Sequence, residues 1–163
     1  MNNSKKWTVL SRRIKEFSLL LVVLSLLILN SCVSSSTSVQ VNEIPSLAEN
    51  KSRIFFYRTK LLFGSGMKPA IYLNGKKVGF SISGTAFYVD VDPGKHKVSV
   101  AKIMYPGTPG GVDLEVRGNE LAYVRTWTGG ASFGGQTDAA LATPERAKEQ
   151  IAQLKILKFN IEE

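Results

Sequence analysis

Short turn signals divide the part of the chain after residue 50 into runs in which apolar and polar residues alternate. Asn74-Gly75 separates two such runs, and this dipeptide favours a type I′ turn because both of its residues tolerate positive φ. Pro93-Gly94 and Gly118-Asn119 mark two further turns. Short strands joined by turns at this spacing predict an all-β fold, mainly an antiparallel β-sandwich.

The strand pattern recurs in several short segments. The predicted strands cover residues 52–58, 70–73, 77–82, 85–91, 96–100, 112–116 and 121–128. The first of them is apolar on both faces, which is typical of a central strand that is covered on both sides. In the strand after Asn74-Gly75, we expect Val78, Phe80 and Ile82 to face inward and the residues between them to face outward.

The periodicity changes near the C-terminus. Thr143-Pro144-Glu145 offers a capping residue, a proline suited to the first helical position and an early acid. Ala147, Ile151 and Leu154 then recur at the spacing of one helix face. The sequence therefore predicts one short C-terminal helix, and the alternation in 157–161 is consistent with a last strand.

The N-terminal segment has the order of an export signal. Basic residues outnumber acidic ones in residues 1–16, and an apolar run follows from Phe17 to Leu29. A helix that spans the hydrocarbon core needs roughly 20 apolar residues, so this run has the length of a signal peptide. The only cysteine of the chain, Cys32, comes directly after it.

The tetrad Leu29-Asn30-Ser31-Cys32 resembles the lipobox of bacterial lipoproteins. The resemblance implies a diacylglycerol on the sulfur of Cys32, cleavage before this residue and acylation of the new amino group. Val33 stands where an aspartate would retain the protein at the inner membrane, so the resemblance implies the outer membrane. An ordinary cleaved signal with an incidental cysteine and an uncleaved anchor are the alternatives. A lone cysteine in an exported chain forms no internal disulfide, and lipidation explains its presence.

We therefore divide the chain into a signal peptide (1–31), a Ser-rich flexible tether (32–50) and a β domain (51–163). The 21 Lys and Arg against 13 Asp and Glu give a formal net charge of +8, part of which lies in the signal. The remaining excess is too mild to indicate a nucleic-acid partner. A weak attraction to anionic lipid or polymer stays open.

Four segments of the predicted domain resemble the DUF2846 family of exported bacterial domains. They are Ile54–Arg58, Pro69–Gly79, Tyr88–Val98 and Leu121–Arg125, and the likeness in order and spacing covers roughly residues 50–160. The middle stretch also resembles PEGA-type domains, which are small β modules of cell-surface proteins. The resemblance implies a β fold and an envelope location, and it transfers no catalytic residue.

Few residues suggest chemistry. His96 is the only histidine, so a His-based metal cluster or a Cys–His dyad is not expected, and we place it at a sheet margin. Asp90 and Asp92 share a strand face, as do Asp113 and Glu115. Two carboxylates on one face could serve glycoside hydrolysis. The alternative for both pairs is the solvated face of an antiparallel sheet.

The glycine-rich segment 129–135 lacks the Lys and Ser/Thr of a phosphate-binding loop. It is interpreted either as a flexible connection between a strand and the helix or as a partner-contact loop that includes Phe133, Gly134 and Gly135.

Several lysines are predicted to lie at or near turns. They are Lys60, Lys68, Lys76, Lys77, Lys95 and Lys97. They are expected to keep sheet edges from pairing, and contact with anionic lipid or cell-wall polymer is the alternative.

From these features we expect a non-enzymatic module of the bacterial envelope that is held to the membrane by its N-terminal lipid. Loops or exposed strands would bind an envelope protein or a cell-wall glycan, and no cofactor, metal or nucleic acid is expected. The alternative from another class is an envelope hydrolase that acts through paired carboxylates. A third possibility is a simple spacer or surface antigen.

Overall fold

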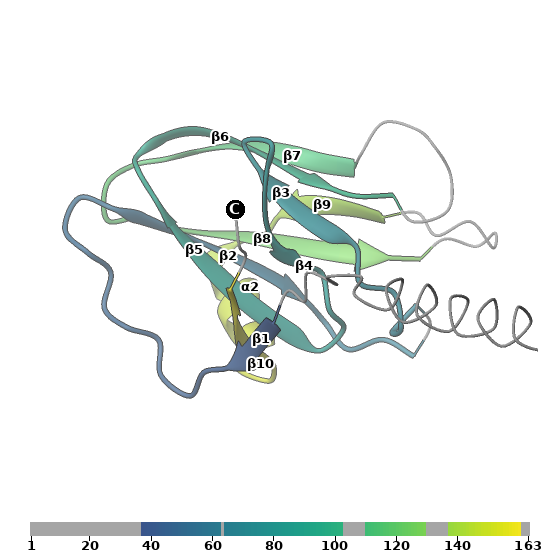
Figure 1. The fold of residues 1–163 in the computed structure, drawn as a ribbon. Helices are drawn as coiled ribbons and strands as arrows, with labels where there is room; N and C mark the ends of the chain where they lie inside the picture. Colours follow the sequence, from purple (N-terminus) through teal and green to yellow (C-terminus); the bar gives the residue numbers. More distant parts are fainter. Residues whose placement is uncertain (1–36, 63, 103–109, 130–136, 161–163) are drawn as a thin grey trace, which may run out of the picture. The chain divides into compact units, whose positions relative to one another are not determined.

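A computed structural model describes residues 37–62, 64–102, 110–129 and 137–160 (Figure 1). The described residues all belong to one compact unit, Ser36–Glu163. The predicted signal peptide, Cys32 and the loop residues Phe133, Gly134 and Gly135 lie outside the described residues. Within the described ranges, no helix is long and apolar enough to cross a membrane.

The strands form two sheets, and the predicted β-sandwich with one short C-terminal helix is confirmed. The larger sheet has the order β1-β10-β5-β2-β8-β9 and the smaller sheet the order β4-β3-β6-β7 (Figure 1). Most neighbours are antiparallel, but β2 pairs with β8 and β5 pairs with β10 in parallel. The strands are β1 Thr37–Gln40, β2 Ser52–Arg58, β3 Ala70–Leu73, β4 Lys76–Phe80, β5 Thr85–Val91, β6 Gly94–Val100, β7 Gly110–Val116, β8 Leu121–Thr128, β9 Thr137–Leu141 and β10 Lys155–Asn160.

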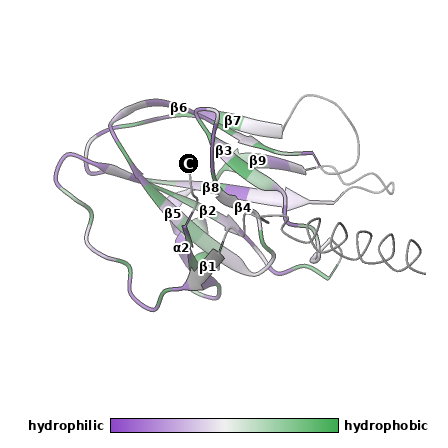
Figure 2. Cartoon of the chain, in the orientation of Figure 1, coloured by the Kyte–Doolittle hydropathy of each residue, from purple (hydrophilic) through white to green (hydrophobic). Residues whose placement is uncertain are grey.

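The main core contains residues from both sheets. Its buried members are Ile54, Phe56, Ile71, Leu73, Phe87, Val91, Val98, Val100, Leu114, Val116, Val124 and Ala139. In Figure 2, hydrophobic residues are green, for example on β3 and β5. Apolar burial on two facing sheets is the main force that holds such a sandwich together.

A second apolar cluster lies on the other face of the larger sheet. It joins Phe55, Tyr57 and Tyr123 to Ala147 of helix α2, which spans Pro144–Ile151. The alternate residues Ile54 and Phe56 belong to the main core. Strand β2 is therefore buried on both faces along its whole length, as its apolar sequence predicts.

Helix α2 begins as the sequence predicts. Thr143 is the extended N-cap residue, Pro144 occupies the first turn, and Glu145 is the early acid. Ala147 is fully buried, because only a small side chain fits where the helix approaches the sheet.

The hairpin of β3 and β4 contains the expected turn. Asn74 and Gly75 have φ values of 53° and 83°, so both central residues are left-handed, as a type I′ turn requires.

Val78 packs against the main core as predicted, but the predicted alternation is wrong beyond it, because β4 contains a bulge. Tyr72 pairs with Lys77 and Ile71 with Gly79, which leaves Val78 without an opposite residue. One extra residue reverses the phase of the side chains beyond it. Gly79 and Ser81 are buried, although the sequence placed them outside.

Two strands were not predicted. Residues 37–40, which the sequence assigns to the flexible tether, form β1 and pair with β10. Residues 137–141 form β9, so a strand separates the glycine-rich segment from helix α2. Both segments are short and weakly patterned, and pairing with a neighbouring strand supplies the order that their composition does not indicate.

Candidate functional site

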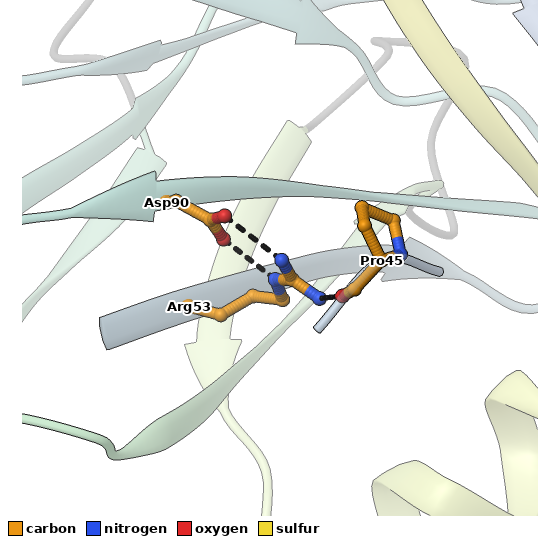
Figure 3. A network of polar contacts seen from close by, with 3 residues as sticks. All are labelled: Pro45, Arg53 and Asp90. Carbon is orange, nitrogen blue, oxygen red and sulfur yellow. Dashed lines mark hydrogen bonds and ion pairs between the residues drawn. The ribbon is translucent and has the colours of Figure 1, made fainter. Parts of the chain in front are cut away.

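A paired arginine and aspartate connect the two long central strands of the larger sheet (Figure 3). Arg53 of β2 lies directly opposite Asp90 of β5. Its Nε lies 2.5 Å from Oδ1 and its Nη2 lies 2.8 Å from Oδ2, so the two groups form a bidentate pair. Its Nη1 donates to the carbonyl oxygen of Pro45 at 2.7 Å. The guanidinium carbon also lies 4.2 Å from the ring centre of Tyr88.

Each carboxylate oxygen of Asp90 accepts one hydrogen bond from Arg53 in this network, and the side chain of Asp90 stays 35% exposed. Arg53 is only 3% exposed, and its hydrogen bond to Asp90 raises its pKa, while burial acts in the opposite direction. The network ties segment 41–50 to the sheet through Pro45. Asp90 therefore has a structural partner, the buried guanidinium of Arg53.

The other predicted carboxylates are also placed beside cations. Asp92 accepts from the Nζ of Lys51 at 2.6 Å in an exposed pair. On β7, Asp113 lies opposite Lys97 and Glu115 lies opposite Lys95 in the register with β6. Asp113 and Glu115 are exposed. They therefore lie on the solvated face of the smaller sheet, which the sequence analysis gives as the alternative to catalysis. A shallow hollow of about 460 Å³ lies over this part of β6 and β7.

His96 has partners at both ring nitrogens. Its Nδ1 lies 3.0 Å from Nδ2 of Asn74, and its Nε2 lies 2.9 Å from the carbonyl oxygen of Asp92. Oδ1 of Asn74 accepts from the backbone N–H of Lys97, so its amide nitrogen donates to His96. His96 then donates through Nε2, and neither ring nitrogen is left to bind a metal ion. Within the described residues, no group of three His, Cys, Asp or Glu side chains could hold one.

The predicted lysines are all exposed. Lys76 and Lys77 lie on β4, the outer strand of the smaller sheet, where they fit the expected role at a sheet edge. Lys95 and Lys97 lie on the part of β6 that pairs with β7 but precedes its register with β3 at Val98–Val100, so a role at a sheet edge stays a prediction for them.

An apolar groove opens where β4, β5 and β10 meet. Its volume is about 310 Å³. Its lining residues are Lys77, Val78, Phe87, Tyr88, Val89, Leu157, Lys158 and Phe159. The ring of Phe159 lies 5.0 Å from that of Phe87 on the larger sheet and 5.9 Å from that of Phe80 on the smaller sheet. Through this ring, β10 contacts both sheets of the sandwich.

The groove lies beside an unpaired stretch of β5. Strand β10 pairs with β5 only at Thr85 and Ala86, and its later residues, Leu157–Asn160, pair only on the opposite edge, with β1. No other strand of the described residues pairs with Phe87–Val91 on this side. Open sheet edges and apolar grooves are both surfaces that bind extended segments. The sequence did not reveal this site, because β5 has the same alternation as a strand with two neighbours.

A second hollow, of about 470 Å³, lies between helix α2 and the start of the β2–β3 connection. Lys60, Arg146 and Gln150 line it, and the hydroxyl of Tyr57 donates to Oε1 of Gln150 at 3.0 Å. Burial raises the pKa of Tyr57, while the charges of Arg125 and Arg146 oppose the shift. Its walls are more polar than those of the groove, and both hollows are open to solvent.

Comparison with known proteins adds a family and no activity. The family described as "Protein of unknown function (DUF2846)" matches residues 48–135, more than half of the chain, and the PEGA-type resemblance is not confirmed. No curated protein and no solved structure matches the chain. The match includes β4 and β5 of the groove, whereas β10 lies beyond it.

Proposed function

The chain belongs to the DUF2846 family, and on this basis we propose that it is a lipid-anchored protein of the bacterial envelope whose β domain binds a partner without catalysis. One observation carries the binding role: an apolar groove adjoins an unpaired stretch of β5. A sheet edge of this kind offers unsatisfied backbone groups, and the groove offers apolar contact area.

The anchor follows from the N-terminal sequence. A single acyl chain binds membranes only marginally, whereas two or three chains on Cys32 would hold the protein there permanently. With Val33 after the cysteine, the proposed location is the periplasmic face of the outer membrane. The domain would act as a scaffold or binding module that is kept close to this membrane.

The proposed partner is an envelope protein, and a cell-wall glycan is the second choice. The groove favours a protein, because its walls are mostly apolar and its edge can pair with a peptide backbone. A glycan would require exposed polar groups, such as those over β6 and β7. The mild net charge gives no reason to expect a nucleic acid.

The hydrolase alternative can be tested without disturbing the fold. Replacement of Asp90 would confuse the outcome, because this residue pairs with the buried Arg53. The variants Asp92→Asn and Asp113→Asn with Glu115→Gln remove exposed carboxylates instead. Loss of an activity on cell-wall material in these variants, with folding intact, would favour the enzyme over the binding module.

Site-specific photocrosslinking in intact cells tests the binding role. A photoreactive residue replaces Lys158 at the rim of the groove, and the control replaces Lys95 on the outer face of β6. We expect one discrete adduct from position 158 and none of the same mass from position 95. Equal adducts from both positions, or none from either in a folded and anchored protein, would contradict a binding role for the groove.

The anchor has a separate test. We expect Cys32→Ala to accumulate as an uncleaved precursor without incorporated palmitate, whereas the unmodified chain is labelled and sediments with outer-membrane markers. Equal palmitate labelling of the two proteins would refute the lipid anchor while leaving the binding site untouched.

A further inference from the structure

The hydrogen bonds of β2 define which backbone groups of β5 are free. The N–H of Arg53 donates to the carbonyl oxygen of Glu120, so the odd-numbered residues of β2 point their backbone groups toward β8. The even-numbered residues then point toward β5, where Ile54 lies opposite Val89. Val89 and the other odd residues of β5 therefore bond to β2, and Tyr88 and Asp90 direct their N–H and C=O groups to the open edge.

The two strands that flank this edge leave room for a third. β10 pairs with β5 for two residue pairs only, and beyond them the groove lies between Phe87–Val89 of β5 and Leu157–Phe159 of β10. Val89, Leu157 and Phe159 form apolar walls on both sides of the opening. Two lysines, Lys77 and Lys158, are the charged residues of its lining, and the lining contains no acid.

We propose that an extended segment of a partner protein adds to β5 as a new strand, with its backbone bonded to Tyr88 and Asp90 and its alternate side chains in the groove. The proposal rests on the binding role proposed above and specifies how the partner is held. The segment alternates apolar residues with polar ones and carries acidic residues beside Lys77 and Lys158.

The backbone groups decide between a peptide and other occupants. A fatty acyl chain could fill the apolar walls, but it cannot pair with the N–H and C=O groups of Tyr88 and Asp90. A second copy of this chain could offer its own β5 edge or its outer strand β4. Either one would bring its lysines beside Lys77 and Lys158 of the groove, and like charges repel.

Hydrogen exchange of the full chain in detergent micelles tests whether the edge is open. We expect the amides of Tyr88 and Asp90 to exchange fast and those of Phe87 and Val89, which bond to β2, to exchange slowly. Slow exchange at Tyr88 and Asp90 in the free protein would show that the edge is already paired, and it would overturn the proposal.

A synthetic peptide tests strand addition directly. The probe alternates valine and threonine over seven residues and carries two glutamates at each end. A control peptide has the same sequence with alternate amide nitrogens methylated, which removes the N–H donors from one edge of the strand. We expect only the unmethylated peptide to bind and to slow exchange at Tyr88 and Asp90. Equal binding of both peptides, or binding of palmitate in place of either, would overturn strand addition.

Charge reversal tests the chemistry of the partner. Lys77→Glu with Lys158→Glu should weaken binding of the glutamate probe about tenfold and favour a version of the probe with lysines at its ends. The matched control, Lys60→Glu with Lys68→Glu, replaces two exposed lysines outside the lining of the groove and should leave binding unchanged. An equal loss in both double variants would contradict contact at the groove.

The outcomes separate this inference from the broader proposal. A discrete crosslink from position 158 together with failure of the peptide experiments would keep the binding role and remove strand addition. Self-association that saturates the groove, seen as a dimer in sedimentation and as protection of Tyr88 at high protein concentration, would replace the partner protein by a second copy and overturn the proposal as stated.

Discussion

Arg53 and Asp90 lie opposite each other on β2 and β5 and join through two hydrogen bonds of 2.5 and 2.8 Å. The pair fixes the register of the two strands at the end of β5 that lacks a second neighbour. It also holds Pro45 against the sheet. Asp90, for which the sequence left a catalytic role as the alternative, thus helps to keep the neighbouring edge of β5 in place.

Asp90→Asn should destabilise the domain by about 2 kcal/mol, because it leaves the buried charge of Arg53 without a full counter-charge. The partial exposure of Asp90 keeps the loss below that of a fully buried pair. Urea unfolding followed by tryptophan fluorescence measures the difference. The control is Asp92→Asn, whose exposed pair with Lys51 should cost less than about 0.5 kcal/mol. Equal losses of unfolding free energy in the two variants would show that the pair of Arg53 and Asp90 stabilises the domain no more than an exposed ion pair does.

Two buried tyrosines should make the domain sensitive to alkali. Burial raises the pKa of Tyr57 and of Tyr123 above the ordinary value of 10.0. Because the folded state holds these protons more tightly, the stabilisation is complete below about pH 10 and is lost as the pH rises through the folded-state pKa values. Urea midpoints measured from pH 8 to pH 11 should therefore fall most steeply above about pH 10.

The double variant Tyr57→Phe with Tyr123→Phe provides the control for this dependence. It should be less stable at pH 8, since the hydrogen bond from Tyr57 to Gln150 is lost, but its midpoint should fall less above about pH 10. Parallel curves for both proteins would assign the alkaline loss to other groups.

The fold was predictable where the order of apolar and polar residues along a strand matches the order of buried and exposed positions. β2 reads as apolar on both faces and is covered by two clusters, and Asn74-Gly75 forms the turn that its residues require. The phase of β4 was not predictable, because a bulge at Val78 depends on how β3 pairs with it. β1 exists only by pairing with a strand far away in the sequence.

The sequence predicted the candidate site less well than it predicted the fold. A groove forms where the pairing of β10 with β5 ends. The end of this pairing depends on how the strands are arranged, and no residue of either strand indicates it in the sequence. The pairing of Arg53 with Asp90 had a weak signal, because a buried arginine needs acceptors for its N–H groups. The sequence could not say which acceptors, since Arg53 pairs with an acid whereas Arg58 of the same strand bonds to carbonyl oxygens.

Gly79→Ala should destabilise the domain by about 1–3 kcal/mol. A Cβ at this position would lie 2.8 Å from ring atoms of both Phe87 and Phe159, so the two rings would have to separate. The thermal midpoint measures the loss. Gly66→Ala is the matched control, because a Cβ there has no atom within 4 Å and should leave the midpoint almost unchanged. Equal midpoints for the two variants would mean that the rings beside the groove move freely.

Arg58 is a buried cation that no described acid neutralises. It is 1% exposed, and burial lowers its pKa. Nη1 donates to the carbonyl oxygens of Met67 at 3.0 Å and Ser81 at 3.2 Å, and Nη2 donates to that of Gly64 at 2.6 Å. Its Nε has no partner. The planar guanidinium thereby joins the connection between β2 and β3 to the end of β4.

Arg58→Lys should cost about 2 kcal/mol, because one ammonium on a flexible stem cannot reach all three carbonyl oxygens and leaves at least one of them unpaired. The connection between β2 and β3 should also become accessible, so limited trypsin digestion should cut at Lys60 or Lys68 sooner than in the parent protein. The matched control is Arg117→Lys, since the side chain of Arg117 is exposed and the substitution keeps a basic residue in place. An Arg58→Lys protein with the parent's urea midpoint and digestion rate would show that the three carbonyl contacts do not hold this connection.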